Sequence, residues 1–266
     1  RRGRCRSIIA DEIAKECGGP AFIADPVVVD EFQLKARVSG VPGIKRESIF
    51  HALNQKAVAR RYAKSIGKKY EELNLIVVHL GGGISVGAHR KGLVIDVNNA
   101  LNGEGPISPE RAGTVPSEAL ATLCFSGKYT LNEVKKMLHG KAGLAAYLGT
   151  SDMITIEEKA IEGKEPYKTL VAAMDYTVAK EIGAMFVALK GQCDAIILTG
   201  GIAYSDYCVA DIKEQIEYLC KVVVLPGGYE MESLSENAFG ALTGELPVLT
   251  YTGVSCAEEI PGMAEA

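Results

Sequence analysis

The sequence lacks several features that would assign a protein to a class at once. No apolar run approaches the roughly 18 residues of a membrane span. The charged opening RRGRCRS has no apolar h-region, so neither a membrane segment nor a signal peptide is expected. The net charge of −4 gives no electrostatic reason to expect nucleic acid as a partner. What remains is an ordinary composition, 47% hydrophobic and 23% charged, which is typical of globular domains.

Cysteine spacings typical of metal or redox sites are also missing. The seven cysteines are scattered and none stands in a C-x-x-C pair, so zinc and redox motifs are not indicated. Scattered thiols fit a reduced, cytoplasmic protein. The sequence begins at Arg1 without an initiator methionine, and its basic cluster RRGRCR has a solvated end as its simplest interpretation.

Strand and helix patterns alternate along the chain, which predicts the α/β class. Near the N-terminus, apolar periodicity predicts a helix ending at about Cys17 and a second helix over 48–67 with Ser48 as its N-cap. Between them we expect a short buried strand ending at Asp25 and, over 31–40, an extended segment or a weak strand.

The remainder of the chain should supply most of the sheet. Residues 75–97 read as three successive strands in an antiparallel meander. A long loop rich in glycine, proline and asparagine follows, of a kind that compact domains usually keep for function. Several helices come next, then the strand patterns of CDAIILT and KVVVL and a final helix, and everything after Pro247 should be a tail.

The stretch HLGGGISVG places Gly81, Gly82 and Gly83 between two strand patterns. Glycine is costly in strands unless the backbone bends sharply or another group approaches it closely. Phosphate loops and dinucleotide folds have a helix after their glycines, so this corner is neither. Two interpretations remain open: a nest of backbone N–H groups for an anion, or a β-bulge without a ligand.

A second glycine corner, IILTGGIAYS, leads from a strand into a helix. The free N–H groups of that helix could receive an anion, although any strand-to-helix turn needs small residues. The presence of both corners in one chain favours a ligand. The hairpin would then hold the β- and γ-phosphates of a nucleotide, and Gly200, Gly201 and Ile202 would lie beneath the adenosine.

Five stretches together resemble the acetokinase family, which belongs to the acetate and sugar kinase, Hsp70 and actin superfamily. They cover most of the chain between Ile8 and Gly244 and read FIADPVVVDEF, SIFHALNQKAVARRYA, NLIVVHLGGGISVGAH, VIDVNNALNGEGPISPERAG and AIILTGGIAYS. Acetate kinases carry F-H-G-T-S-H and H-L-G-N-G where this sequence reads FHALNQ and HLGGG. The resemblance is therefore to the branch that uses butanoate.

The resemblance implies a fold of duplicated ribonuclease-H-like (actin-like ATPase) domains, the first one incomplete. Residues 1–72 would be the remnant of the first domain, 73–245 the second domain with the nucleotide site, and 246–266 a tail. The implied activity is a phosphotransferase reaction, reversible transfer between ATP and butanoate with Mg²⁺. An apolar pocket separates acids differing by one methylene by only about 1–3 kcal/mol, so branched short-chain acids and acetate remain alternatives. A homo-oligomer without nucleic acid or membrane partners is also implied.

Two candidate residues come from this resemblance. Arg111, in SPERAG, stands where the family places a catalytic arginine; the alternative is a surface salt bridge with Glu110 or Glu104. Asp25 matches a family aspartate that would orient the acyl phosphate or the metal; the alternative is a turn-capping role.

The histidines and one acid complete the candidate set. His51, expected one turn into a helix, matches a family histidine. A second histidine, credited with stabilising the transition state, corresponds here to Gln55, whose amide can donate to phosphate but carries no charge. His79 is expected to contact phosphate or to be a buried structural histidine. Glu230 corresponds to a magnesium-linked glutamate, and an acid at a helix N-terminus is its alternative reading.

Two family features have no counterpart in this sequence. They are a phosphate loop of the N-P-G-S-T-S-T-K type and a second catalytic arginine, both expected before the helix near Ser7. Family members have a small, mostly uncharged run where this sequence reads RRGRCRS. That break predicts a truncated or misassembled reading frame. A catalytically inactive kinase fragment is therefore the competing hypothesis.

Overall fold

The computed structural model describes residues 2–250 and is built around one mixed sheet of five strands. Its order is β3-β2-β1-β4-β5, with β1–β3 antiparallel and β4 and β5 parallel to β1. The expected meander is confirmed, because β2 pairs with β1 and with β3. The strands are β1 Asn74–Leu80, β2 Ile84–Arg90, β3 Leu93–Val97, β4 Ala195–Gly200 and β5 Val222–Pro226.

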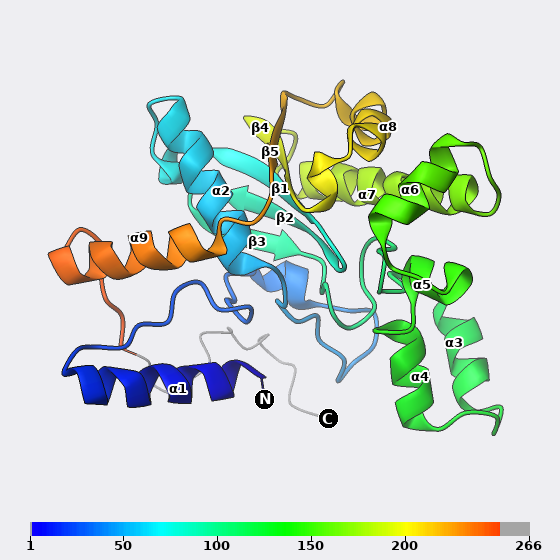
Figure 1. Ribbon diagram of the computed structural model, residues 1–266, viewed down its shortest axis with the longest axis horizontal. Helices are drawn as coiled ribbons and strands as arrows, with labels where there is room; N and C mark the ends of the chain where they lie inside the picture. The colour runs from blue at the N-terminus through cyan, green and yellow to red at the C-terminus, as the bar shows by residue number, and fades with distance from the viewer. Residues whose placement is uncertain (1, 251–266) are drawn as a thin grey trace.

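Helices cover both faces of this sheet (Figure 1). One face carries α2 and the other carries α7 and α8, as their contacts with the central strands show. The helices are α1 Arg2–Cys17, α2 Ala52–Ser65, α3 Ser117–Cys124, α4 Leu131–Leu138, α5 Gly143–Leu148, α6 Met153–Ile161, α7 Tyr167–Ala188, α8 Asp206–Ile216 and α9 Glu230–Thr243, with short 3₁₀ turns η1 Leu34–Arg37, η2 Tyr70–Glu72 and η3 Ile202–Tyr204.

The period of two along each strand decides which side chains meet which helix layer. Ile76, Val78 and Leu80 of β1 pack with α7 and α8, whereas Leu75 and Val77 pack against α2. In β2 the apolar set Ile84, Val86 and Ala88 also faces α7. The α2 face of β2 is therefore left to Ser85, Gly87 and His89. A polar stripe beneath a helix is unusual in a core.

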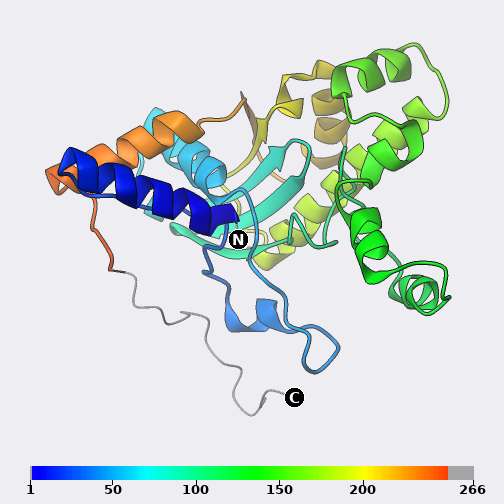
Figure 2. The same ribbon diagram turned by 60° about the horizontal axis from the view of Figure 1, so that its bottom comes forward.

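The segment before α2 packs along the β3 edge of the sheet, and two expectations for it are wrong (Figure 2). Residues 21–25 form no strand: no described strand pairs with them, and Ala21 and Ile23 are exposed. The stretch expected to be extended contains the 3₁₀ turn η1, because Phe32 and Ala36 fold inward onto Val94 and Val97 of β3.

Helix α2 begins later than the sequence pattern predicts. Ser48 does not cap it, because its hydroxyl donates to the carbonyl oxygen of Val29 at 2.6 Å. His51 is the N-cap residue and makes no side-chain capping bond, so it stands before the first turn instead of one turn inside the helix. Because of this difference, the His51 imidazole lies at the N-terminal end of α2, where it faces the sheet.

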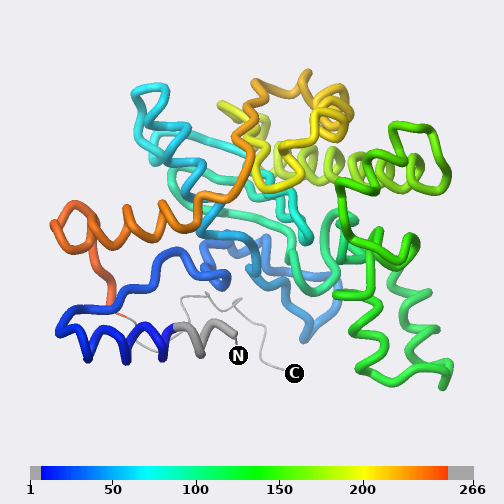
Figure 3. Tube along the Cα trace, in the orientation of Figure 1, coloured from blue at the N-terminus to red at the C-terminus, as the bar shows by residue number. Residues whose placement is uncertain are grey.

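Residues 117–148 leave the sheet as α3, α4 and α5 before the chain returns through α6 and α7 (Figure 3). The sequence missed α5, which has only six residues. None of the helices within 2–250 has the length and apolar character needed to cross a bilayer. The final part of the expected tail, 251–266, lies outside the described residues.

Candidate functional site

The two glycine corners lie side by side at the carboxyl ends of neighbouring parallel strands. β1 pairs with β4 in register from Leu75↔Ala195 to His79↔Thr199. Gly200 has φ +91°, and a Cβ on it would overlap the carbonyl oxygen of Leu80. Ligands of open α/β sheets gather at such strand ends. The close approach of Gly200 to Leu80 explains why the sequence needs glycine there.

The second corner differs from the expectation in one respect. The strand β4 does not lead directly into an α-helix, because the 3₁₀ turn η3 intervenes. The first turn of α8 is capped from within the protein: the Ser205 hydroxyl accepts from the N–H of Cys208 at 3.0 Å. The N–H groups of α8 are therefore set back from the glycine pair. Ile202 is buried, whereas Gly201 is exposed and faces open space.

The glycine hairpin between β1 and β2 is fixed by the loop that follows β3. The carbonyl oxygen of Gly82 accepts from the Ser108 hydroxyl at 2.8 Å and from the Glu110 N–H at 3.1 Å. Ser108 is fully buried. The loop expected to serve function therefore packs against the tip of the hairpin and delivers Arg111 to it.

Two stacked imidazoles stand beside the hairpin. His51, at the start of α2, and His79, near the end of β1, have ring centroids 3.9 Å apart and planes inclined by 15°. A Cβ on Gly83 would lie 3.8 Å from His51 Cε1, and one on Gly81 would lie 3.1 Å from His79 Nε2. Both rings therefore border the glycine backbone. The Nδ1 atom of His79 is 2.7 Å from Asn54 Oδ1, one turn along α2.

Both imidazoles are uncharged near neutral pH. Burial, reinforced by the nearby Arg111 cation, lowers the pKa of His51 from 6.5 to about 4. Burial, with His51 as neighbour, lowers the pKa of His79 from 6.5 to about 3. A neutral imidazole still carries one N–H and can donate it. The rings can thus offer hydrogen bonds to an anion without carrying positive charge.

Arg111 contributes the positive charge beside these rings. Its Nη1 atom is 3.1 Å from the carbonyl oxygen of Glu110 and 3.4 Å from Glu110 Oε2. The contact with Glu110 is the alternative that the sequence left open, and it is long and partly exposed. The Nε atom of Arg111 is buried and has no hydrogen-bond partner among the described residues. A buried guanidinium N–H without an acceptor fits an anion at this position.

Gln55 lies deeper than a residue that touches substrate would. It is fully buried, and its Nε2 atom donates to the Ser85 carbonyl oxygen at 3.0 Å and to Ser85 Oγ at 2.8 Å. Ser85 Oγ is in turn 2.8 Å from His51 Nδ1. Sequence reasoning missed Ser85 and Asn54. The signal was available, because the period of two places Ser85 on the α2 face and Asn54 follows His51 by one helical turn.

Asp25 is engaged in ion pairs. Its Oδ2 atom is 2.9 Å from Arg60 Nη1, and Oδ1 is 3.9 Å from Lys56 Nζ, both on α2. Lys56 also pairs with Glu31 at 2.6 Å. Asp25 has a positive φ of 37° and precedes Pro26, so the chain turns sharply here. These contacts tie the segment before η1 to the middle of α2.

Glu230 stands in the first turn of α9, at the carboxyl end of β5. Its side chain folds back over Gly228, where a Cβ would overlap Oε2. Gly227 bridges to Gly200 through two backbone hydrogen bonds of 3.1 and 2.9 Å. Glu230 is thus brought to the same edge of the sheet as the second corner. Among residues 7–250, no three histidine, cysteine or acidic side chains group as a ready-made metal cage.

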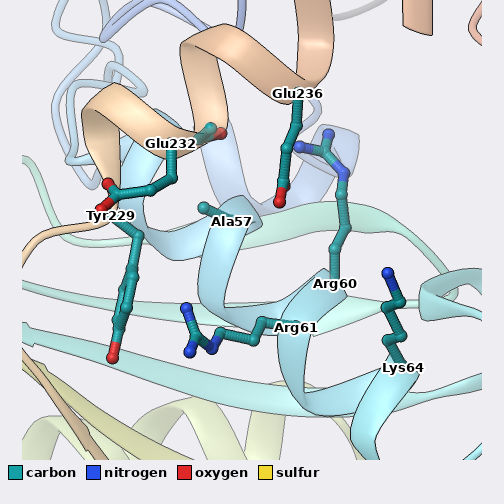
Figure 4. Close-up of a pocket in the computed structure, with 8 residues that line it drawn as sticks. Ala57, Arg60, Arg61, Lys64, Tyr229, Glu232 and Glu236 are labelled. Atoms are coloured by element: carbon teal, nitrogen blue, oxygen red, sulfur yellow. The ribbon is translucent and has the colours of Figure 1, made fainter. Parts of the chain in front are cut away.

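A groove of about 410 Å³ lies between α2 and α9, away from the glycine corners (Figure 4). Figure 4 shows basic side chains of α2 and acidic side chains of α9 projecting into it. The guanidinium of Arg61 lies 4.5 Å from the centre of the Tyr229 ring. The groove borders the C-terminal half of α2, whereas His51 precedes its first turn. At 1.5 Å per residue, the nine positions from His51 to Arg60 span about 13 Å. We place the chemistry at the glycine corners, where the buried Nε atom of Arg111 has no hydrogen-bond acceptor among the described residues.

Comparison with known proteins places these features in a family. The model of the acetokinase family matches residues 30–223. The chain is 70% identical over 245 residues to a probable butyrate kinase of Phocaeicola vulgatus and 55% identical over 244 residues to butyrate kinase 1 of Clostridium acetobutylicum. In both cases the match covers 92% of this chain and 69% of the relative.

Solved structures agree on the fold. An acetate kinase of Porphyromonas gingivalis matches with a TM-score of 0.70 at 21% identity, over 78% of this chain and 60% of that one. A propionate kinase of Francisella tularensis matches with a TM-score of 0.68 at 21% identity, over 77% of this chain and 60% of that one. At this identity the likeness shows the fold alone, which is the actin-like ATPase fold expected from the sequence.

Proposed function

The chain belongs to the acetokinase family, and we propose that it serves reversible phosphoryl transfer between ATP and butanoate, giving ADP and butanoyl phosphate. The observation that carries the proposal is the convergence at one sheet edge of the glycine hairpin, two neutral histidines and Arg111 with its unpaired Nε. Such transfers need in-line positioning and stabilisation of charge on the moving group more than covalent chemistry.

Each group at this edge receives a role in the proposal. The backbone N–H groups of Gly81, Gly82 and Gly83 hold the β- and γ-phosphates. Gly200 and Gly201 lie beneath the adenosine, and a Cβ on Gly201 would meet only open space there. Arg111 and the imidazoles of His51 and His79 stabilise the charge that develops on the transferred phosphoryl oxygens.

A divalent metal fits the donor chemistry of the edge. Magnesium is usually held by one or two carboxylates together with substrate phosphates, not by an all-protein cage. The absence of a cage among the described residues is therefore no obstacle, and Glu230 is the carboxylate we assign to Mg²⁺. When bound with ATP, the metal would neutralise charge on the phosphate oxygens.

Asp25 and Gln55 act indirectly in this proposal. The carboxylate of Asp25 is neutralised by Arg60 and Lys56. This favours a role in holding the segment before η1 on α2 over direct metal binding. Gln55 has given both of its amide hydrogen bonds to Ser85, which favours a supporting role.

The remaining assignments follow the family interpretation. We propose a boundary between two domains near residue 73, and a homo-oligomer in the cytoplasm. The five cysteines with described side chains are free thiols, which is consistent with a reducing compartment. We propose butanoate over acetate or branched acids because the relatives that are 70% and 55% identical to this chain are named for butyrate.

An acyl hydroxamate assay tests the activity directly. The sequence contains no N-P-G-S-T-S-T-K loop, and removing one preorganised donor commonly costs about 3–4 kcal/mol. We therefore expect no measurable transfer by the 266 residues alone. Fusion to the part of the Phocaeicola vulgatus relative that the match leaves uncovered should give transfer to butanoate that is faster than transfer to acetate.

Three outcomes are informative. Faster transfer to acetate would move the protein to the acetate-using branch. Robust turnover by the 266 residues alone would show that the catalytic parts are wrongly assigned. An inactive but folded fusion would contradict the proposed function.

A further inference from the structure

We infer that Gln55 and Ser85 are positioning residues that hold the imidazole of His51 as its Nε2–H tautomer, so that His51 presents a hydrogen-bond donor to the glycine hairpin. The use of that donor rests on the proposed function, whereas the tautomer itself does not. The inference comes from a continuous row of hydrogen bonds beneath α2, where the sheet carries polar side chains. The row runs from His51 through Ser85, Gln55 and His89 to Tyr70.

The direction of the hydrogen bonds in the row is fixed at its centre, by the backbone carbonyl of Ser85. The side-chain amide of Gln55 is 3.0 Å from the Ser85 carbonyl oxygen, which can only accept a hydrogen bond. The amide nitrogen must therefore face Ser85, because the flipped amide would set two acceptors against each other. The Oε1 atom then faces His89 Nε2, at 2.9 Å.

The far half of the row is consistent with this orientation. Since Oε1 of Gln55 accepts, His89 Nε2 carries the hydrogen and Nδ1 of the same ring is bare. That bare nitrogen lies 2.6 Å from the Tyr70 hydroxyl, which can donate to it. His89 is fully buried, and burial lowers its pKa to about 3, so the ring is neutral. Every polar atom in this half has a partner of the right kind.

The near half sets the tautomer of His51. Ser85 Oγ accepts from Gln55 Nε2 at 2.8 Å, and the backbone N–H of His51 points at it from 3.5 Å. Both of these neighbours are donors. The hydroxyl hydrogen of Ser85 is therefore free to be given to His51 Nδ1, at 2.8 Å. A neutral imidazole that accepts at Nδ1 carries its hydrogen on Nε2.

The opposite tautomer is disfavoured by the burial of Ser85. If His51 donated from Nδ1, the Ser85 hydroxyl would accept from every neighbour and its own hydrogen would have no acceptor among the described contacts. Ser85 is fully buried, so water does not replace the missing partner. The penalty for a buried unpaired polar group corresponds to roughly tenfold or more in the tautomer ratio.

The free edge of the ring faces the hairpin. The carbon between the two ring nitrogens, Cε1, is 3.8 Å from the place where a Cβ on Gly83 would stand. The stack on His79 holds the ring plane. Hydrogen-bond donors fixed in advance of the reaction stabilise developing charge without reorganisation. Gln55, though buried, thus acts on the site through Ser85.

Nitrogen-15 NMR of the full 266-residue chain, labelled at histidine, tests the tautomer without substrate. The sequence has only four histidines, so His51 is assigned by loss of its signals in His51→Gln. We expect a protonated Nε2 and a bare Nδ1 for His51 at pH 7. A protonated Nδ1 of His51 in the wild-type protein would overturn the inference, whether or not the Ser85 variants fold.

Matched variants test the role of the serine hydroxyl. Ser85→Ala should raise the proportion of the Nδ1–H tautomer by about tenfold, whereas Ser85→Thr, which keeps the hydroxyl, should not. Tyr70→Phe is the control, because it removes a hydroxyl from the far end of the row and should leave His51 unchanged. An unaltered His51 tautomer in folded Ser85→Ala would contradict the positioning role.

The same variants separate this inference from the proposed function. In the transfer-competent fusion, Ser85→Ala should lower kcat by about tenfold and leave the KM for butanoate unchanged. If the predicted tautomer is found but His51→Gln transfers phosphate at the normal rate, the positioning stands and the catalytic role proposed for His51 is wrong.

Discussion

At the scale of single residues, the site combines one half-buried cation with uncharged donors. Arg111 reaches the hairpin from the loop after β3, and its Nε atom is buried without an acceptor. Its neighbours His51 and His79 stay neutral because burial lowers their pKa values. Positive charge beside the hairpin therefore depends strongly on Arg111.

Replacing Arg111 should lower transfer without unfolding the protein. Arg111→Ala in the transfer-competent fusion should reduce kcat by about 10²–10³, the usual effect of losing one donor to a developing oxyanion. Arg111→Lys should recover little of it, because the bidentate fork is lost. Arg90→Ala, at the exposed end of β2, is the matched control. Equal activity of the Arg111 and Arg90 variants would remove Arg111 from the mechanism.

Asp175 on α7 is a second residue whose surroundings set its charge. It is fully buried, and its carboxyl oxygens have no partner among the described residues except the Cys208 thiol. Burial, with Asp211 and Glu157 nearby, raises its pKa from 3.8 to about 8. Between about pH 4 and 8, the Asp175 carboxyl is therefore protonated in the folded protein and ionised in the unfolded chain. The free energy of unfolding attributable to Asp175 falls as pH rises through that window.

The variant Asp175→Asn should remove this pH dependence. Its Tm should exceed that of the wild type by a margin that widens by about 5 °C or more between pH 5 and pH 8, since each pH unit is worth about 1.4 kcal/mol. Asp206→Asn, at an exposed position in the first turn of α8, serves as the control. A constant margin across the pH range would show that Asp175 is ionised in the folded state.

At the scale of elements, the two adjoining glycines of the second corner serve different purposes: Gly200 allows close packing of two strands, and Gly201 leaves space for a ligand. Gly200 has φ +91°, and a Cβ on it would overlap the backbone of Leu80, whereas Gly201 has φ −68° and a Cβ on it would have no neighbour within 4 Å. A methyl group on Gly200 should push β1 and β4 apart. The same group on Gly201 meets only space that the proposed adenosine would occupy.

Alanine at these two positions should therefore act on different properties. Gly200→Ala should lower the free energy of unfolding by about 2 kcal/mol or more through strain and overlap. Gly201→Ala should leave stability equal or slightly higher, yet weaken binding of an ATP analogue by about tenfold. Calorimetric titration and urea unfolding measure the two effects. Unchanged nucleotide affinity in Gly201→Ala would place the adenosine elsewhere.

The sequence predicted those elements whose patterns are local. The strands β1–β5 follow from apolar runs and turns, and the meander was found because its turns are short. The start of α2 was misplaced because the Ser48 hydroxyl is used by Val29, a tertiary contact. The expected strand at 21–25 failed because a strand needs a partner, and none of the described strands pairs there.

Prediction of the site shows the same division. Arg111, His51, His79 and the glycines could be named from motifs, and the structure brings them to one edge. For Ser85 the period of two gives only its place on the α2 face, because its importance arises from contacts with residues 30 and 34 positions earlier. The ion pairs that hold Asp25 likewise join positions far apart in the chain.

At the scale of the whole molecule, the strand order 3-2-1-4-5 gathers both corners at one end of the sheet. A dinucleotide oxidoreductase would instead begin a helix directly after its glycines, and here β1 and β2 form a hairpin. The sheet therefore favours a nucleoside triphosphate over a nicotinamide dinucleotide.

Thermal unfolding of the 266-residue chain with increasing ATP analogue and Mg²⁺ tests this central claim most directly. A ligand that binds only the folded state stabilises it by about 2.7 kcal/mol at one hundred times its Kd. We expect a Tm that rises with the logarithm of the analogue concentration and that does not change when NADH is added. A Tm indifferent to the analogue, or raised as much by NADH, would contradict it.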